Sequence, residues 1–337
     1  MPETISILLP FRNAGSTLAE CVDSILAQTH PHWELVAVND HSEDGGDQWL
    51  RQLARRDSRI RVLNNPRKGL VNALNHGLAA CRHELVARMD ADDIMYSQRL
   101  AAQLNHFSNG HELALSATQV RLFPEALIEK GFREYIRWQN QCRSAADIAR
   151  QIYVESPFAH PSVMFRKSRI QALGAYRHGL FPEDYDLWLR LFHSGQPMEK
   201  LPEVLLDWRE SPKRVSRTDP RCSREAFDNL RARYLARDSR LLAHRDNFVI
   251  WGAGRKTRKR CRHLLDLGFQ PRAWVDIDPK KIGNEIRGTP VVNSGWLARN
   301  GRPFVLIYVA NHGAREDIAE ELDTLGYAQG ENYLAVG

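Results

Sequence analysis

Cysteine is scarce in this sequence, and the few thiols stand far apart. The five cysteines include no CxxC pair, which argues against a disulfide framework and against a structural zinc site. We therefore expect reduced and mostly buried thiols. Long hydrophobic runs are missing as well, because no stretch approaches the roughly 18 consecutive apolar residues of a membrane span. The start, MPETISILLPF, meets a proline and then an arginine too early for a secretory signal, so a cytoplasmic protein is expected.

Acidic residues are few in one segment, which makes the charge of the chain uneven. The net charge is +6, but residues 209–262 hold 17 Lys or Arg against 6 Asp or Glu, a local +11. A basic stripe can hold nucleic acid, an anionic membrane surface or a phosphorylated substrate, or it can be a solvated helix face. No nucleic-acid-binding module is recognisable, so nucleic acid is not an expected partner. Peripheral contact with the inner face of a membrane stays open.

Strand and helix patterns alternate in the first part of the chain. Short apolar runs predict strands at 5–9, 34–38, 60–63 and 84–89. Helical spacing predicts a helix after each of the first three strands, the later two at 45–56 and 69–81. Ser16 or Thr17, followed by Glu20, predicts a capping box at the start of the first helix. Such a β-α-β-α-β-α-β series predicts an α/β fold with a mostly parallel sheet and helices on both faces.

A cluster of polar residues follows each of the four predicted strands. The clusters are PFRNA (10–14), NDHSEDG (39–45), NPRKG (65–69) and DADD (90–93). Ligands of parallel sheets bind beyond the carboxyl ends of the strands. The starts of the same strands carry no comparable group of carboxylates. We therefore predict that the four loops form one site at a shared edge of the sheet.

The chemistry of DADD narrows the kind of ligand. Asp90 and Asp92 project to one side if the segment is extended, and carboxylates this close repel one another unless a cation lies between them. Oxygen ligands without a nearby His or Cys favour Mg²⁺ or Mn²⁺ over zinc. An EF-hand is disfavoured because its glycine and its distal glutamate are missing. Since Mg²⁺ and Mn²⁺ often complete their shell with substrate phosphates, a nucleotide or a sugar diphosphate is the expected ligand.

The sequence also resembles a known family. The run ISILLPFRNAGSTLAECVDSILAQTHPHWELVAVNDHSEDG, followed by NPRKGLVNALNHGLAAC and ELVARMDADDI, resembles the family-2 glycosyltransferases of the GT-A fold over about residues 4–217. The resemblance implies that Asp40 binds the nucleotide base in a pocket lined by Pro10 and Phe11. It further implies that Asp92 binds the metal and that Asp90 contacts the nucleotide.

The same resemblance implies supporting roles for further residues. Asp93 supports either of its neighbours, and the loop and helix that border the nucleotide contribute Lys68, Gly69, Asn72 and Asn75. Lys68 is placed to meet a phosphate.

Two departures from the family pattern are visible. His41 in NDHS stands where relatives often have a glycine, which alters the rim of the pocket. Glu210 in DWRESPKRVS stands where a histidine usually follows the arginine. If that histidine assists the metal or the diphosphate in relatives, this chain uses Glu210, Arg209, Lys213 or Arg214 instead, or relies on the cation alone.

The segment FPEDYDLWLRL (181–191) predicts a mostly buried helix with acidic residues in its first turn. The structural interpretation is that these acids complement the helix dipole. The resemblance implies a catalytic base at the aspartate of the ED pair, which is Asp184, with Glu183 as a supporting residue. A carboxylate at a helix start is expected to stay ionised and can take a proton from an acceptor hydroxyl. Asp186 is expected to be structural.

His160, in FAHPSVMFRKS (158–168), has two interpretations. It either contacts the acceptor or holds the site as a hydrogen-bonded structural residue, and a lone histidine before a proline is more often structural.

The C-terminal part begins a new pattern. Strands are predicted at 247–251, 272–278 and 304–310, with helices at about 255–267 and 314–326. GAG (252–254) after a strand, with Asp276 ending the next one, weakly suggests a Rossmann phosphate turn. The segment resembles small Rossmann-like modules attached to sugar-modifying enzymes. A bound dinucleotide, a structural or docking role, and a phosphate or lipid headgroup on the cations from Arg255 to Arg262 all stay open.

The sequence thus predicts three parts and one main activity. The parts are a GT-A domain at 1–217, a basic helical connector at 218–245 and a small Rossmann-like domain at 246–337. The resemblance implies a metal-dependent inverting glycosyltransferase that uses Mn²⁺ or Mg²⁺ and a nucleotide-diphosphate sugar, most commonly a UDP-sugar. Its acceptor would be a hydroxyl of a glycan or a lipid-linked molecule in cell-surface polysaccharide assembly. The alternatives are a nucleotidyltransferase-type metal enzyme and a non-catalytic nucleotide- or anion-binding protein.

Overall fold

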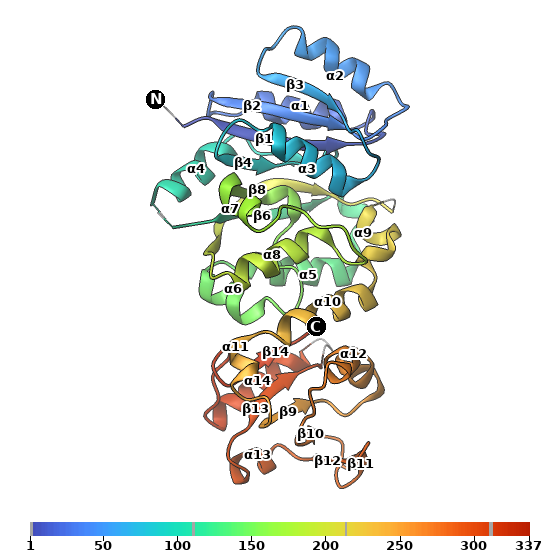
Figure 1. Cartoon of the computed structure of the whole chain (residues 1–337), viewed down its shortest axis with the longest axis vertical. Coiled ribbons are helices and arrows are strands. Elements are labelled where there is room, and N and C mark those ends of the chain that lie inside the picture. The colour runs from blue at the N-terminus through green and yellow to red at the C-terminus, as the bar shows by residue number, and fades with distance from the viewer. Residues whose placement is uncertain (1–2, 110–111, 213, 310–312) are drawn as a thin grey trace. The chain divides into compact units, whose positions relative to one another are not determined.

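The computed structural model describes residues 3–109, 112–212, 214–309 and 313–337. The chain divides into two compact units, both visible in Figure 1. The first comprises residues up to 148 with 157–179 and 183–218, and the second comprises 149–156, 180–182 and 219–337. No helix in the described part of the chain is long and apolar enough to cross a membrane.

The first unit is built on one sheet. Its strands are β1 (Ile5–Phe11), β2 (Trp33–Asn39), β3 (Ile60–Asn64), β4 (Leu85–Arg88), β5 (Ile94–Met95), β6 (Leu115–Phe123), β7 (Met164–Arg166) and β8 (Met198–Arg209). The helices up to residue 218 are α1 (Leu18–Leu26), α2 (Gly46–Ala54), α3 (Leu70–Ala80), α4 (Arg99–Asn109), α5 (Lys130–Gln141), α6 (Ala145–Gln151), α7 (Lys167–Ala172), α8 (Glu183–His193) and α9 (Val215–Thr218).

The sheet of the first unit is mixed. The strand order is β3-β2-β1-β4-β7-β6-β8-β5. Strands β3, β2, β1 and β4 pair in parallel, which confirms the predicted β-α series and its four strands. The other half of the sheet, formed by β5 to β8, was not predicted. In it β7 runs antiparallel to both β4 and β6, and β5 runs antiparallel to β8. These strands are separated in sequence by long helical segments, so no local pattern reveals their pairing.

Helices cover both faces of the parallel half, as predicted. Buried side chains of α1 and α2 pack with Ile5, Ile7 and Leu9 in one core. On the opposite face α3 lies so close to the sheet that a Cβ on Gly77 would meet Leu8 Cδ1 at 2.3 Å and Val38 Cγ2 at 2.8 Å. Glycine is therefore required at this contact, since any side chain would overlap the sheet.

The start of α1 differs from the prediction. Thr17 is the N-cap residue, but no side chain caps this helix. The Thr17 hydroxyl donates instead to the carbonyl oxygens of Ala91, at 3.0 Å, and Ala14, at 3.3 Å. The predicted capping box is therefore wrong, because the hydroxyl that it needs ties the helix to the loop after β4.

The second unit has its own sheet and core. Its strands are β9 (Phe248–Trp251), β10 (Trp274–Val275), β11 (Glu285–Ile286), β12 (Thr289–Val292), β13 (Phe304–Ile307) and β14 (Tyr333–Ala335), and its helices are α10 (Arg224–Leu235), α11 (Ser239–Leu242), α12 (Arg255–Asp266), α13 (Gly295–Arg299) and α14 (Ala314–Thr324). The sheet order is β11-β12-β10-β9-β13-β14, and every pair except β11 with β12 is parallel.

The sequence predicted only part of this second sheet. The three predicted strands correspond to β9, β10 and β13, but β10 keeps only two residues of the predicted 272–278. β11 and β12 were missed because most of their residues are not buried and form no apolar run, and β14 was missed because it has only three residues. Helices α10 and α11 are grouped with the C-terminal residues in the second unit, where α10 packs against α12.

Candidate active site

The four polar loops meet at one edge, as the parallel order of β3, β2, β1 and β4 requires. The loop after β1 joins the loop after β2 where the backbone N–H of Asn13 donates to Ser42 Oγ at 3.0 Å. The loop after β2 joins the loop after β3 through Asp40 and Gly69. Thr17 joins the loop after β1 to the loop after β4. The edge is therefore one connected surface of backbone and polar side chains.

Asp40 lies at the end of β2 and is only 6% exposed. Its Oδ1 accepts hydrogen bonds from Asn65 Nδ2 at 2.7 Å and from the backbone N–H of Gly69 at 2.9 Å. Asn65 was not singled out by the sequence, although it opens the NPRKG cluster and is itself buried. The carboxylate is thus fixed by the neighbouring loop before any ligand arrives.

The loop after β3 leads directly into α3. Gly69 is the N-cap residue of α3 and has φ +126°, a conformation that glycine adopts without strain. Asn72 donates to the Lys68 carbonyl oxygen at 3.2 Å and contacts His178 Nε2 through Oδ1 at 3.0 Å. Asn75 exchanges two hydrogen bonds with the backbone of Tyr176. Lys68 is exposed at a helix N-terminus, where an anion is favoured.

Two further predicted residues at this edge have contrasting positions. Phe11 is 3% exposed and packs in the apolar core, next to the buried Pro10. His41 is exposed and has φ +60°, the left-handed region that glycine adopts without cost. The departure at His41 therefore strains the backbone at the rim of the edge and leaves its imidazole outside the core.

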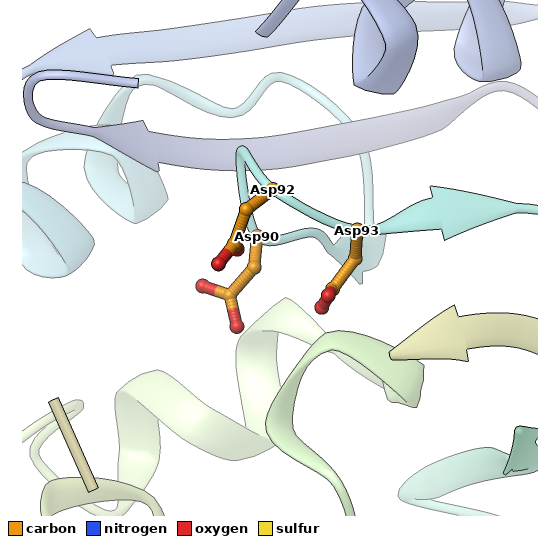
Figure 2. Close-up of side chains that lie close together, drawn as sticks. All are labelled: Asp90, Asp92 and Asp93. Atoms are coloured by element: carbon orange, nitrogen blue, oxygen red, sulfur yellow. The ribbon is translucent and has the colours of Figure 1, made fainter. Parts of the chain in front are cut away.

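The three aspartates of the loop after β4 lie close together. One oxygen from each of Asp90, Asp92 and Asp93 lies within 4.8 Å of the others, and Figure 2 shows the three carboxylates on the same side of the loop. Burial and the charge of Asp90 raise the pKa of Asp92 to about 6. Burial raises the pKa of Asp93 well above its usual range, with Asp90 and Asp92 adding to the effect. Three carboxylates thus repel one another at a site that is only partly open to solvent.

The backbone behind this loop is held by Arg209, at the end of β8. The Arg209 N–H donates to Asp93 Oδ1 at 2.8 Å, and its Nε donates to the Asp92 carbonyl oxygen at 2.6 Å. Its guanidinium also pairs with Glu20 and lies 4.3 Å from the centre of the Phe123 ring. Arg209 therefore supports the loop from β8, while Asp93 Oδ2 is buried without a hydrogen-bond partner among the described residues.

A buried arginine that the sequence did not single out pairs with the same loop. Arg88, the last residue of β4, is 2% exposed, and its Nη1 lies 2.5 Å from Asp90 Oδ1. The only sequence signal was its position, two residues before Asp90 in a strand that is otherwise apolar.

Asp184 lies in the first turn of α8, as predicted, but its pKa differs from the prediction. Burial and the charge of the adjacent Glu183 raise the pKa of Asp184 to about 7. Its Oδ1 accepts the backbone N–H of Tyr185 at 2.7 Å. The expectation that the helix start keeps Asp184 fully ionised is therefore wrong, because desolvation outweighs the dipole. A pKa near neutral is well suited to a group that accepts a proton during a reaction.

The rest of α8 is structural. Leu187, Trp188, Leu189 and Leu191 are fully buried, which confirms the pattern expected for this helix. Asp186 forms a buried ion pair with Arg190 at 2.8 Å.

His160 is buried beside α8. Its Nε2 lies 2.9 Å from the Tyr176 hydroxyl, and its ring meets Trp188 edge to face. Burial and the nearby charge of Arg88 lower the pKa of His160 well below its usual value. The imidazole is therefore neutral, and a hydrogen-bonded structural position is the simplest account of its contacts.

Glu210, which replaces the expected histidine, is 3% exposed. Its carboxylate pairs with Arg217 Nε at 2.9 Å and with Arg214 Nη1 at 3.4 Å. Arg214 also stacks on Trp208, 4.1 Å from the ring centre, and its charge offsets part of the rise that burial and Asp90 cause in the pKa of Asp92. Glu210 thus orients a cation near the aspartates; Lys213, the other predicted substitute, lies outside the described residues.

Comparison with known proteins shows the family of the chain. Residues 6–173 match the family model described as Glycosyl transferase family 2. The amylovoran biosynthesis glycosyltransferase AmsE of Erwinia amylovora is 33% identical over 64% of this chain and 78% of its own length. The chain belongs to glycosyl transferase family 2. The resemblance inferred from the motifs is thereby confirmed.

Two other proteins are similar to this glycosyltransferase. The UDP-Gal:alpha-D-GlcNAc-diphosphoundecaprenol beta-1,3-galactosyltransferase of Escherichia coli is 28% identical over 69% of this chain and 82% of its own. Residues 1–349 of S. aureus TarS, solved in complex with UDP-GlcNAc, superpose with a TM-score of 0.56 at 16% identity, covering 70% of this chain and 67% of that chain. At this identity the structural likeness shows the shared fold.

In the second unit of the glycosyltransferase, the predicted ribose-binding acid already has partners. Asp276 is 7% exposed and accepts the backbone N–H groups of Ala253, at 2.8 Å, and Asp278, at 2.9 Å. Lys281 Nζ lies 3.0 Å from the same carboxylate. A Cβ on Gly252 would lie 2.7 Å from Thr257 Oγ1. The carboxylate and the backbone of the turn after β9 are therefore already in contact with neighbouring groups of the protein.

The basic segment of the glycosyltransferase contains many local ion pairs. In the described part of the chain, seven arginines of the predicted stripe pair with acids: Arg209, Arg214, Arg217, Arg221, Arg231, Arg240 and Arg262. Much of the local charge is therefore compensated within the segment. Four exposed cations of α12, for which the described part of the chain contains no ion pair, form a smaller basic surface: Arg255, Lys256, Arg258 and Lys259.

Proposed function

We propose that this glycosyltransferase moves a sugar from a nucleotide-diphosphate sugar to an acceptor hydroxyl with inversion. The observation that carries the proposal is the cluster of three carboxylates at the edge where the four loops meet, beside a buried cation that pairs with one of them. Arg88 pairs with Asp90 in the aspartate loop, and its charge offsets part of the rise that burial and Glu183 cause in the pKa of Asp184 on α8. The charge of Arg88 therefore acts both on the aspartate loop, where a charged donor would bind, and on Asp184, a candidate base with a pKa near neutral.

The donor is proposed to be a UDP-sugar. The relative from E. coli is named for a UDP-Gal donor, and the TarS fragment was solved with UDP-GlcNAc. In this chain Asp40 would contact the base, and Lys68 with the start of α3 would meet the phosphates. The acceptor is proposed to be a glycan or a lipid-linked molecule in polysaccharide assembly, as the names of the E. coli and Erwinia amylovora relatives suggest.

A divalent cation fits the loop after β4. Three carboxylates converge there, and the buried Asp93 Oδ2 has no hydrogen-bond partner among the described residues. These hard oxygen donors suit Mn²⁺ or Mg²⁺, with Asp92 as the proposed ligand and Asp93 in support. When bound, such an ion neutralises negative charge on a leaving diphosphate.

Two side chains of the protein have further proposed roles in the transfer, Asp184 and Arg214. Asp184 accepts the proton of the acceptor hydroxyl as that oxygen attacks the anomeric carbon, and its pKa of about 7 allows it to do so near neutral pH. Arg214, stacked on Trp208 and paired with Glu210, adds positive charge near the aspartates. A single base without a nucleophile beneath the sugar corresponds to inversion at the anomeric carbon.

The proposal is tested by incubating the protein with a panel of nucleotide sugars and acceptors, with and without Mn²⁺. We expect metal-dependent release of a nucleoside diphosphate together with a glycosylated acceptor. Asp92→Asn and Asp184→Asn should each lower kcat by at least about 100-fold. Asp323→Asn is the matched control, because Asp323 is exposed on α14 of the second unit.

The product distinguishes the alternatives. Transfer of the nucleotide itself to an acceptor would establish a nucleotidyltransferase and overturn the proposal. Binding of donors without turnover, unchanged in Asp92→Asn and Asp184→Asn, would establish a non-catalytic binding protein.

We further propose peripheral contact with an anionic membrane through the exposed cations of α12. Lys and Arg near a negative lipid surface contribute about 1 kcal/mol each. Sedimentation with vesicles that contain phosphatidylglycerol, compared with neutral vesicles, measures the contact. Binding that is indifferent to lipid charge, or unchanged when Lys256 and Lys259 are replaced by Glu, would refute it. A cytoplasmic location beside the inner face of the membrane stays a prediction.

A further inference from the structure

Arg88 is an unusual residue to find at the end of β4. The strand is buried along its whole length, and the Arg88 side chain is 2% exposed. Its Nη1 lies 2.5 Å from Asp90 Oδ1, whereas the Asp90 side chain is 32% exposed. One partner of this ion pair is therefore desolvated and the other faces the edge of the sheet where the loops meet.

Stability alone does not account for this arrangement. Arg88 Nε is buried and has no hydrogen-bond partner among the described residues. An unsatisfied buried donor costs free energy, and a buried ion pair is often no more stabilising than apolar side chains of similar size. Buried polar groups of this kind call for an explanation other than packing.

The surroundings of Arg88 indicate what it does. Of the three clustered aspartates, Asp90 is the one that Arg88 contacts, while Asp93 is held by the backbone N–H of Arg209. Arginine stays charged at every physiological pH. One of three identical acids is therefore tied to a fixed cation, and this makes Asp90 chemically different from Asp92.

We propose that Arg88 is a positioning residue that holds Asp90 away from the metal, so that Asp92 takes the cation and Asp90 stays available to the donor. This inference rests on the proposed use of a divalent cation and a nucleotide sugar. The three carboxylates carry a charge of −3 when ionised, and Arg88 reduces this to −2, which one divalent cation balances. Without Arg88 the freed Asp90 carboxylate turns toward the metal, because nothing else in the described part of the chain holds its side chain.

The test compares Arg88→Met, Arg88→Lys, Asp90→Asn and the double variant Arg88→Met/Asp90→Asn with the wild type. Three quantities are measured: the Tm without ligands, the Kd for Mn²⁺ without donor, and kcat/KM for the donor. Methionine keeps an unbranched chain that can stay buried, although it is shorter, and it removes the charge; lysine keeps the charge but loses the planar fork of donors.

We expect Arg88→Met to keep the Tm of the wild type or exceed it, and to bind Mn²⁺ equally well or more tightly. Its kcat/KM should fall on the order of 100-fold, the cost of a misplaced contact in an active site. Arg88→Lys should recover a large part of this loss. The kcat/KM of the double variant should be no lower than that of the less active single variant, because both changes remove the same interaction.

Two results would overturn the inference. A lower Tm together with weakened Mn²⁺ binding in Arg88→Met would make Arg88 a structural residue. Additive losses in the double variant would show that Arg88 does not act through Asp90. If the wild type binds Mn²⁺ and UDP but transfers no sugar, the same four variants are compared by their Kd for UDP. Failure of the proposed transfer and failure of the positioning role are then separate outcomes.

Discussion

Replacing Asp184 by asparagine should have opposite effects on activity and on stability. Burial and Glu183 raise the pKa of this carboxyl from 3.8 to about 7, so the folded protein resists its ionisation. Asparagine has nearly the same shape and no charge. The substitution therefore removes both the proposed proton acceptor and a destabilising buried charge.

The size of the gain in stability follows from the pKa. A rise from 3.8 to about 7 spans about three pKa units, and each unit corresponds to about 1.4 kcal/mol. Because Glu183 shares the repulsion and the pair titrates together, roughly half of this product, ~2 kcal/mol, is expected for Asp184 alone. In a unit of this size ~2 kcal/mol raises Tm by about 4–8 °C.

The sign of the pH dependence is fixed by linkage. The folded pKa lies above the unfolded one, so this group's contribution to stability is full below pH 3.8 and is lost as pH rises through about 7. The advantage of Asp184→Asn over the wild type is therefore complete at about pH 8. It should fall below half at about pH 5, where the folded carboxyl is protonated and only the unfolded one is ionised.

Thermal denaturation at several pH values, with Asp323→Asn as the control, measures this gain. The wild-type kcat should decline below about pH 7, and Asp184→Asn should lose about 100-fold or more in kcat. An equal change in Tm at pH 5 and pH 8, or a variant less stable than the wild type, would refute the reasoning, because either result means that ionised Asp184 costs the folded state nothing.

Two more substitutions test the packing of the fold. Gly77→Ala should lower the free energy of unfolding by about 1–3 kcal/mol, since its Cβ would overlap Leu8 in β1. Gly131→Ala on α5, which meets no atom within 4 Å, is the matched control; equal Tm values for the two variants would contradict the close contact of α3 with the sheet. Glu210→Gln should lower Tm through a loss of about 2 kcal/mol, because two arginines lose their shared buried carboxylate. An unchanged Tm would mean that the pairs contribute nothing.

Several features of the site could be predicted because they depend on local pattern. The alternation of strands and helices gave the parallel half of the first sheet, and the positions of Asp40, Asp90 and Asp92 after strands placed them at one edge. The second unit was recognised only in part, since β12 is mostly unburied and forms no apolar run and β14 has only three residues. The capping box failed because a distant carbonyl, that of Ala91, competes for the Thr17 hydroxyl.

The sequence by itself determined the family, the order of the loops and the residue types at their ends. The family follows from the resemblance of several motifs in their order, and the other two properties follow from periodicity and spacing, which are local. Only the tertiary structure decided which charges face each other. It buried Arg88 against Asp90, fixed Asp40 on Asn65 and Gly69, and raised the pKa of Asp184 to about 7. Burial and long-range pairing set these energies, because they depend on how much water is excluded and which distant groups replace it.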